Sequence, residues 1–310
     1  MNPVIMPPMI GDQATALREL VLDRRIAGPG SKITGMKSIA ILSGKGGVGK
    51  SNMAVNLGLA MAEMGLRVTI LDADLGLANI DILFGVVPKF NIGHVLRGVK
   101  ELSEILYKVG DLVSIIPGGA GLRELADLDD QRQSWMIDRL SVLEDETDVL
   151  LLDTSAGIHK NVLVFAMASD MSLLLTTPEP TAIRDSYSVL KSLCQTNGGD
   201  INAAIVVNMV ADYHEAAMVS ERIISTAEQF LNIKVPYMGC ILWDSALREA
   251  VKRRRPLLLD DDSSVSAPCF RELAARIIEA PDGNFHRGVE SEQYSFLSRL
   301  VRQMGKKGTL

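Results

Sequence analysis

The sequence predicts an α/β protein with a single doubly wound, mainly parallel sheet. Short apolar runs alternate along the chain with longer segments that have helical spacing. The runs are apolar almost without interruption, as in strands that helices cover on both faces. A chain of 310 residues with 47% hydrophobic content can also bury a large core. These observations favour one large α/β core domain.

The first 36 residues precede the first expected strand and form a separate segment. Residues 12–25 have the apolar spacing of a short helix, which Asp12 can cap. Residues 26–35 contain Gly28, Pro29 and Gly30 and are expected to be a flexible linker. A short amphipathic helix on a tether cannot bury its apolar face alone. It therefore needs a groove, either on this chain's own core or on a partner protein.

The core is expected to begin with a strand at residues 39–42, a glycine-rich turn and a helix at residues 50–64. The turn has the G-x-x-x-x-G-K-[ST] spacing of a phosphate-binding loop, in which Lys50 can reach the β- and γ-phosphates and Ser51 can bind Mg²⁺. Its backbone N–H groups would cradle the phosphates, and the helix adds its positive end. The predicted nucleotide-binding residues are Gly44, Lys45, Gly46, Gly47, Val48, Gly49, Lys50 and Ser51.

Lys45 gives this loop a second lysine, five residues before Lys50. The run Lys-Gly-Gly-Val-Gly-Lys-Ser at residues 45–51 resembles the deviant Walker A loop of the MinD/ParA family of ATPases. The resemblance implies a P-loop NTPase domain that binds ATP or ADP with Mg²⁺. It also implies that Lys45 reaches the phosphates held by a second protomer, so that ATP joins two protomers. Without the resemblance, Lys45 is an ordinary solvated lysine.

Carboxylates follow two of the expected strands. Strand 67–72 ends in Asp72, with Asp74 shortly after it, and the apolar strand 148–153 ends in Asp153. In an open parallel sheet these ends face the phosphates, and Asp153 has the Walker B form that places a carboxylate beside Mg²⁺. The resemblance implies that Asp74 orients the attacking water and that Asp72 lies near the Mg²⁺ shell. Residues 154–157 resemble the family's switch II. The predicted catalytic residues are Asp74, Lys45 and Lys50, and the predicted metal site is Ser51, Asp72 and Asp153.

The alternation continues to residue 280, so the ATPase domain is predicted to span residues 37–280. By the same resemblance, Asn208 would bind the adenine amino group; otherwise it is a turn residue after a strand. The further expected strands are 112–116, 171–176, 203–208 and 235–242, and the further expected helices are 92–96, 101–109, 131–143, 181–194, 215–230, 245–252 and 266–279.

Residues 281–310 are expected to be a polar linker followed by an amphipathic helix. One half of that helix carries basic side chains, among them Arg299 and Arg302. A basic amphipathic helix on a tether is typical of an interfacial membrane anchor, which binds weakly alone and more strongly as a pair. A terminal helix packed on its own domain is the alternative. The predicted membrane-facing residues are Tyr294, Phe296, Leu297, Leu300, Val301 and Met304.

The N-terminal helix narrows the family resemblance. Residues 12–18 resemble the Asp-Gln-Ala-x-x-Leu-Arg element of the FlhG group of flagellar-number regulators, also called FleN or YlxH. The resemblance implies that this helix binds the GTPase FlhF and stimulates it. Flagellar switch-complex proteins and a flagellar transcription factor are further candidate partners. The predicted partner-binding residues are Asp12, Gln13, Ala14, Leu17 and Arg18.

Composition disfavours several other functions. The net charge is −6, so no direct nucleic-acid partner is expected, which speaks against a DNA-binding partition ATPase. Cys194, Cys240 and Cys269 form no Cys-x-x-Cys pair, which indicates a reducing compartment and speaks against a metal-cluster carrier. The sequence has neither a signal peptide nor an apolar run of membrane-spanning length. We therefore expect a cytoplasmic protein that binds reversibly to the cytoplasmic face of the cell membrane.

The leading hypothesis is a slow regulatory ATPase. ATP and Mg²⁺ drive an ATP-dependent homodimer, the dimer binds the inner membrane surface, and hydrolysis returns the monomer. The resemblance implies that this switch controls the number and placement of flagella. The alternatives are a MinD/ParA-type ATPase that positions another cargo, the division site or the chromosome, and a binding module in which nucleotide is only structural.

Overall fold

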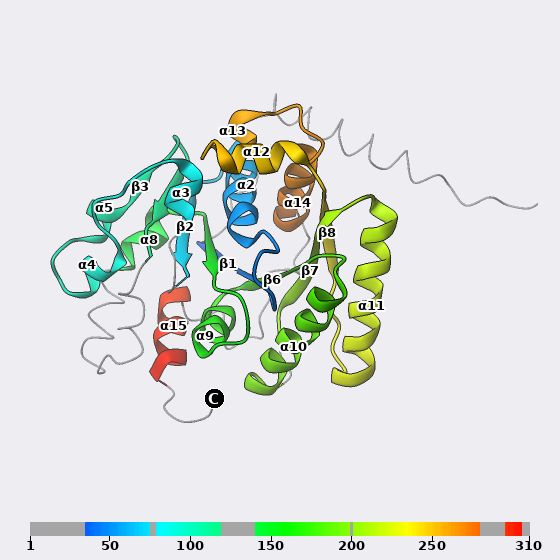
Figure 1. Cartoon of the computed structure of the whole chain (residues 1–310). Coiled ribbons are helices and arrows are strands. Elements are labelled where there is room, and N and C mark those ends of the chain that lie inside the picture. Colours follow the sequence, from blue (N-terminus) through cyan, green and yellow to red (C-terminus); the bar gives the residue numbers. More distant parts are fainter. Residues whose placement is uncertain (1–34, 75–78, 119–139, 199–200, 280–294, 306–310) are drawn as a thin grey trace, which may run out of the picture. The chain divides into compact units, whose positions relative to one another are not determined.

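The computed structural model describes residues 35–74, 79–118, 140–198, 201–279 and 295–305. They form an eight-stranded sheet with the strand order β3-β4-β2-β5-β1-β6-β7-β8 (Figure 1). Each described pair of neighbouring strands is parallel except β3 and β4 at one edge. The predicted doubly wound, mainly parallel sheet is therefore confirmed. The strands are β1 (Lys37–Leu42), β2 (Val68–Ala73), β3 (Tyr107–Lys108), β4 (Val113–Ile116), β5 (Val149–Thr154), β6 (Met171–Thr176), β7 (Ala203–Val210) and β8 (Tyr237–Leu242).

Helices cover both faces of this sheet (Figure 1). On one face lie α2 (Lys50–Glu63), α3 (Ile80–Phe84), α12 (Ser245–Lys252), α13 (Leu257–Asp260) and α14 (Ala267–Glu279). The opposite face carries α9 (Lys160–Ala168), α10 (Pro180–Thr196), α11 (Tyr213–Leu231) and α15 (Phe296–Gly305). The short helices α4 (Ile92–Leu96), α5 (Leu102–Ile105) and α8 (Val142–Glu146) lie toward the β3 edge. No described helix is both long and apolar enough to cross a bilayer.

Alternate side chains of the central strands point into two separate cores. In β1, Ala40 and Leu42 belong to the cluster that includes α9 and α15. Ile39 and Ile41 are equally buried but belong to the opposite side, where α2 packs. Since both faces are covered, most positions of such a strand are apolar, which explains why the sequence shows no regular polar alternation.

Two expected helices differ from the structure. The prediction of a helix at residues 101–109 is wrong, because α5 ends at Ile105 and Leu106 turns into the extended conformation. Tyr107 and Lys108 then pair antiparallel with β4. The expected helix at 131–143 lies mostly outside the described residues, and the helix found there is α8. The other strands and helices predicted within the described residues begin and end within two residues of the observed bounds, whereas the helix predicted at residues 12–25 lies outside the described residues.

Helices α3, α9 and α13 were not predicted. The sequence of α9, KNVLVFAMA, is apolar nearly throughout, and its residues from Val162 to Ala168 are all buried. A helix that is buried on all sides has no polar face, so it lacks the periodicity by which helices are recognised. Helices α3 and α13 span too few residues to show a period.

Candidate nucleotide-binding site

The glycine-rich loop joins β1 to α2 at the carboxyl edge of the sheet. Helix α2 begins at Lys50, and its N-cap Gly49 has a left-handed φ of 96°. A Cβ atom on Gly49 would lie 2.5 Å from the Nδ2 atom of Asn208, and one on Gly44 would lie 2.3 Å from the carbonyl oxygen of Asp185. The loop thus passes too close to β7 and α10 for side chains at these positions. The strand, loop and helix follow one another as predicted.

Lys50 extends back over the loop. Its Nζ atom donates a hydrogen bond to Ser43 Oγ at 2.8 Å. Burial lowers the pKa of Lys50, while the carboxylates of Asp153 and Asp74 act in the opposite direction. A partly buried amine beside a glycine-rich turn is suited to binding a phosphate group.

Asp153 is the last residue but one of β5 and lies beside Asp72 in the sheet, since the two residues are register partners on β5 and β2. The side chain of Asp153 is 1% exposed, and neither carboxylate oxygen accepts a hydrogen bond. Burial raises its pKa well above the ordinary range, and the neighbouring charge of Asp72 adds to that effect, whereas Ser51 and Lys50 oppose it. A buried carboxylate without partners is costly unless a cation satisfies it.

Mg²⁺ fits this arrangement. The ion commonly takes one or two protein carboxylates and completes its octahedron with waters and phosphate oxygens. Asp153 offers two free carboxylate oxygens. The hydroxyl of Ser51, which acts on the pKa of Asp153, is the neighbouring oxygen donor. Ser51 and Asp153 are therefore the residues that would hold the ion.

Asp72 has a structural role in addition to the predicted one. Its Oδ2 atom accepts hydrogen bonds from the backbone N–H groups of Asn79 at 2.8 Å and Ile80 at 3.2 Å. Its Oδ1 atom accepts one from the N–H of Asp74 at 3.2 Å. Burial raises the pKa of Asp72 to about 6, although these hydrogen bonds favour its charged form. Asp72 thus fixes both Asp74 and the start of α3, and the roles of Asp72 near Mg²⁺ and of Asp74 in orienting water stay predictions.

Lys45 does not share the cradle with Lys50. Its Nζ atom is hydrogen-bonded to the carboxylate of Glu179 and to Thr181 Oγ1, the latter at 3.0 Å, and both residues lie at the start of α10. The side chain is 37% exposed, so the amine lies at the rim of the site. The predicted action of Lys45 on a second protomer stays a prediction.

Asn208 is held firmly against the loop. It is 3% exposed, and its Nδ2 atom donates to the carbonyl oxygen of Val48 at 2.8 Å. Its Oδ1 atom accepts from the N–H of Met209 at 2.9 Å, and Met209 has a left-handed φ of 60°. Asn208 therefore braces the phosphate loop from β7. Its contact with adenine stays a prediction.

Several further residues shape the site, and the sequence did not predict them as site residues. Ser43 accepts from Lys50 and, through its carbonyl oxygen, from the N–H of Gly157 at 2.8 Å, which links the loop to the segment after β5. Gly118 follows β4, and a Cβ atom there would lie 1.9 Å from the carbonyl oxygen of Asp72. The only signals were a serine before the loop, a Pro-Gly-Gly run after a strand and Glu179 between two prolines.

The predicted membrane helix lies on the protein's own core in this structure. Phe296, Leu297, Leu300, Val301 and Met304 are each at most 6% exposed and pack against the α9 face. The observed state thus corresponds to the alternative interpretation, a terminal helix packed on its own domain. Contact of this face with a membrane stays a prediction. Tyr294 and the predicted partner-binding residues 12–18 lie outside the described residues.

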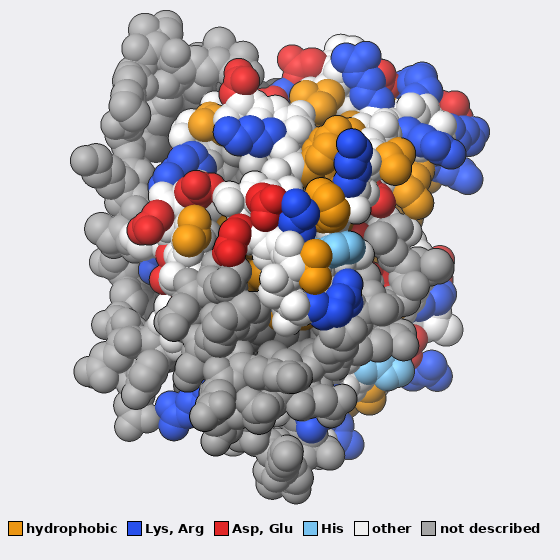
Figure 2. Space-filling view, turned by 90° about the vertical axis from the view of Figure 1, so that its left-hand side faces the viewer, with side chains coloured by type: hydrophobic (Ala, Val, Ile, Leu, Met, Phe, Trp, Pro, Cys, Tyr) orange, Lys and Arg blue, Asp and Glu red, His pale blue; other side chains and the backbone are white. Residues whose placement is uncertain are grey.

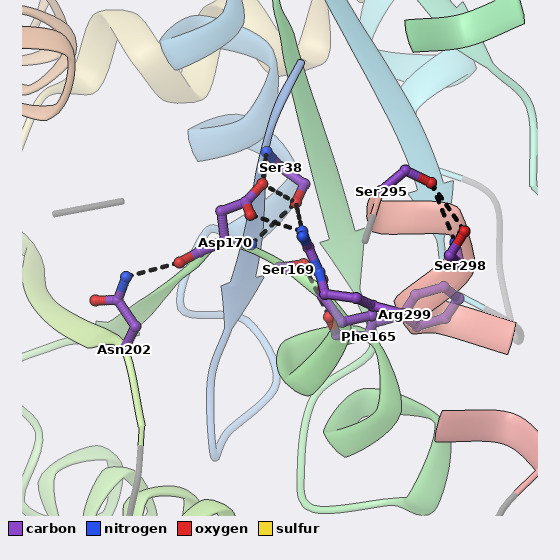
Figure 3. Close-up of polar contacts among 9 residues, drawn as sticks. Ser38, Phe165, Ser169, Asp170, Asn202, Ser295, Ser298 and Arg299 are labelled. Atoms are coloured by element: carbon purple, nitrogen blue, oxygen red, sulfur yellow. Dashed lines mark hydrogen bonds and ion pairs between the residues drawn. The ribbon is translucent and has the colours of Figure 1, made fainter. Parts of the chain in front are cut away.

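A polar network fastens α15 to the rest of the domain (Figure 3). Arg299 forms an ion pair with Asp170 at 2.6 Å and donates to the carbonyl oxygen of Ala168 at 2.7 Å. Asp170 also accepts hydrogen bonds from the N–H and the hydroxyl of Ser38, at 2.8 Å and 2.7 Å. The C-terminal helix, the end of α9 and the start of β1 are therefore joined at one point.

The cysteines have no sign of metal chemistry among the described residues. Cys240 and Cys269 are buried and Cys194 is partly buried, and all three are free thiols. Burial raises the pKa of each.

Comparison with known proteins agrees with this geometry. The model of the CobQ/CobB/MinD/ParA nucleotide binding domain matches residues 39–257. The antiactivator FleN of Pseudomonas aeruginosa is 35% identical over 264 residues, which cover 85% of this chain and 93% of FleN. The flagellum site-determining protein YlxH of Helicobacter pylori is 32% identical and covers 87% of this chain and 91% of its own length.

Among solved structures, the cell division ATPase MinD of Pyrococcus furiosus matches with a TM-score of 0.63 at 25% identity. The match covers 79% of this chain and 99% of that protein. Together with the glycine-rich loop, the partly buried Lys50 and the unsatisfied Asp153, these similarities show that the chain belongs to the MinD/ParA family of ATP-binding P-loop proteins and, within it, to the FleN/YlxH group known as FlhG.

Proposed function

We propose that this chain is an ATP-dependent dimerising switch that regulates the number and placement of flagella. The observation that carries the proposal is that the two lysines of one loop occupy different positions. Lys50 lies inside the loop on Ser43, whereas Lys45 is at the rim, where a second protomer can approach. The flagellar role is supported by two relatives, one named an antiactivator and the other a flagellum site-determining protein.

Each site residue has its own role in the hydrolysis of ATP. Lys50 and the partner's Lys45 stabilise the negative charge that develops on the phosphates. Ser51 and Asp153 would hold Mg²⁺, which neutralises charge on the transferring phosphoryl group. Asp74, held by the carboxylate of Asp72, orients the attacking water. Turnover is slow because each site is complete only when two protomers meet.

Membrane binding is proposed to compete with the docked state of α15. The same apolar side chains that would enter the lipid interface are buried on the α9 face. The helix must therefore leave its own domain before it can bind a membrane. A dimer presents two such helices, and paired binding raises membrane residence without any new contact.

The N-terminal segment is proposed to act on the GTPase FlhF through residues 12–18. This proposal rests on the sequence element alone. A flagellar transcription factor and the switch-complex proteins remain candidate partners, and the name antiactivator of one relative is consistent with the former.

The proposed hydrolysis is tested by Asp74→Ala, because this change removes the group that orients water and leaves the phosphate loop intact. We expect unchanged ATP binding, a persistent ATP-bound dimer and a fall in phosphate release of at least about a hundredfold. Asp111→Ala removes an exposed aspartate far from the loop in sequence and is the matched control. Unchanged phosphate release in Asp74→Ala would contradict the role of Asp74.

The flagellar role is tested by counting flagella in a strain deleted for this gene, using electron microscopy. A changed number or placement of flagella is the expected result. Normal flagella together with misplaced division sites or defective chromosome segregation would contradict the flagellar proposal. That outcome would favour the alternative, a MinD/ParA-type ATPase that positions another cargo.

A further inference from the structure

A second pocket lies away from the phosphate loop, on the opposite face of the sheet from α15. It has a volume of about 610 Å³ and lies between the end of α3, strand β3 and the turn that joins α12 to α13. No residue of the phosphate loop lines it. Figure 2 shows Lys and Arg side chains gathered at the upper right of the face toward the viewer, with hydrophobic side chains among them.

The lining of this pocket is strongly basic. Lys108, Arg253, Arg254 and Arg255 contribute to it, and none of its lining residues is acidic. Asp260 is a neighbouring carboxylate, paired with Arg253 and lying 4.0 Å from Arg255 Nε. Positive charge therefore exceeds negative charge here, although the chain as a whole carries −6. Such a local excess attracts anions.

The arginines project from a fixed turn. The backbone N–H groups of Arg253, Arg254 and Arg255 donate to carbonyl oxygens of α12 at 3.0 to 3.1 Å. Arg254 adopts a left-handed φ of 53°, which favours glycine, yet the chain places an arginine there. A Cβ atom on Gly85 would lie 2.9 Å from the carbonyl oxygen of Arg254, so the turn is pressed against the end of α3. A fixed turn reduces the entropy lost when a ligand binds.

We propose that this pocket is a second anion site, which binds a phosphorylated small molecule of about nucleotide size. A guanidinium group matches the geometry of a phosphate and can donate two parallel hydrogen bonds to two of its oxygens. A volume of about 610 Å³ lies in the range of small-molecule pockets. The apolar part of the lining, which includes Phe84, Pro256 and Leu259, would contact the organic portion of the ligand.

The pocket is connected to the nucleotide site through α3. The end of that helix meets the arginine turn at Gly85, and the N–H groups of its N-cap Asn79 and its first residue Ile80 donate to the carboxylate of Asp72. A ligand that stabilises the arginine turn therefore acts on the helix that Asp72 anchors. We expect it to change the rate of ATP turnover. This consequence, unlike binding itself, rests on the ATPase activity proposed above.

Binding is tested with the full-length protein in saturating Mg-ADP, so that the phosphate loop is occupied. Inorganic tripolyphosphate is titrated by calorimetry, and we expect saturable binding of one ion per chain. Arg254→Gly removes one guanidinium and relieves the left-handed backbone, so it preserves the fold. We expect this variant to weaken binding by about tenfold. Arg248→Gln, on an exposed arginine of α12 outside the lining, is the matched control and is expected to bind as the parent does.

Three results would overturn the proposal. They are no saturable binding, equal binding by the parent and Arg254→Gly, and tighter binding of a glutamate-rich peptide or of anionic vesicles than of tripolyphosphate. Phosphate release is then measured with and without tripolyphosphate. Intact binding in a protein without any ATPase activity would contradict the proposed function and leave the second anion site standing.

Discussion

At the scale of single residues, the nucleotide site depends on glycines, which have no side chain, as much as on residues with functional side chains. Gly44 approaches the backbone of Asp185 so closely that a Cβ atom would lie 2.3 Å from its carbonyl oxygen. Gly46, two residues later, has nothing within 4 Å of its would-be Cβ. The two glycines of one loop thus have different requirements, and the sequence pattern cannot distinguish them.

This difference predicts opposite results for two alanine substitutions. Gly44→Ala forces the loop away from α10, and we expect it to weaken ADP binding by about tenfold or more. Gly46→Ala meets open space, so its affinity is expected to remain within about twofold of the parent. Titration with a fluorescent ADP analogue measures both. Equal affinities of the two variants would show that the contact with Asp185 does not hold the loop.

Asp153 is expected to reduce the stability of the nucleotide-free protein. Its folded-state pKa is raised by burial above the ordinary 3.8, so the folded carboxyl keeps its proton to a higher pH than the unfolded one. The unfolding free energy therefore falls as pH rises from 3.8 through the folded-state pKa. We expect Asp153→Asn to raise the unfolding free energy at pH 8 by about 1 kcal/mol or more, with a smaller gain at pH 5, and to abolish hydrolysis.

The matched control for that prediction lies just before the same strand. Asp148 forms an ion pair with Arg67 at 2.7 Å, and this hydrogen-bonded partner lowers the pKa of Asp148. The effect of Asp148 on stability has the opposite sign. Because its folded-state pKa lies below its unfolded-state pKa, Asp148 stabilises the fold at pH values above the unfolded-state pKa, and this stabilisation is lost as pH falls through the folded-state pKa. Asp148→Asn is therefore expected to destabilise the protein at pH 8. Denaturant unfolding of both variants at the two pH values checks the signs, and destabilisation by Asp153→Asn would contradict the argument.

At the scale of elements, the sequence predicts most strands because each buried strand is a compact apolar run with polar ends. It predicts the phosphate loop because glycine spacing and lysine position are local features. It does not predict α9, since a helix apolar on all sides has no period, or β3, since Tyr107 and Lys108 are assigned by pairing with β4 alone. The contacts of Lys45 with α10 also depend on residues far along the chain.

The docking of α15 leads to a prediction about membrane binding. Asp170→Asn removes the charge that pairs with Arg299 and keeps an oxygen that can accept from Ser38. Loss of the ion pair weakens docking of the helix and leaves its own sequence unchanged. We expect the fraction bound to anionic vesicles without nucleotide to rise by about threefold or more in flotation assays.

A second substitution distinguishes release of α15 from general unfolding of the protein. Leu300→Glu places a charge on the apolar face of α15 and is added to Asp170→Asn. If the released helix itself binds the vesicles, this double variant returns to the parent's low level of binding. Vesicle binding that persists in the double variant would show that some other surface, and not α15, contacts the lipid.

At the scale of the whole molecule, β1 connects the two functional ends of the domain. Ser38 near its start binds Asp170, which holds Arg299 of α15, and Ser43 just beyond its end accepts from Lys50. Nucleotide and the C-terminal helix therefore act on opposite ends of one central strand. Dimer formation at the nucleotide end is the step that would couple them.

If ATP joins two protomers as proposed, substitutions of the two lysines of the loop are expected to have different effects. Lys50→Ala removes the amine inside the cradle and is expected to abolish binding of ATP and ADP. Lys45→Ala removes an amine at the rim that contacts Glu179 and Thr181, so ADP affinity is expected to stay within about threefold of the parent. Because each protomer then lacks the group that reaches its partner's phosphates, ATP should no longer produce a dimer in light scattering. Lys89→Ala, on an exposed lysine outside the loop, should dimerise normally. An ATP-dependent dimer of Lys45→Ala would mean that the rim lysine does not join the protomers and that this chain uses its loop as an ordinary single-subunit phosphate site.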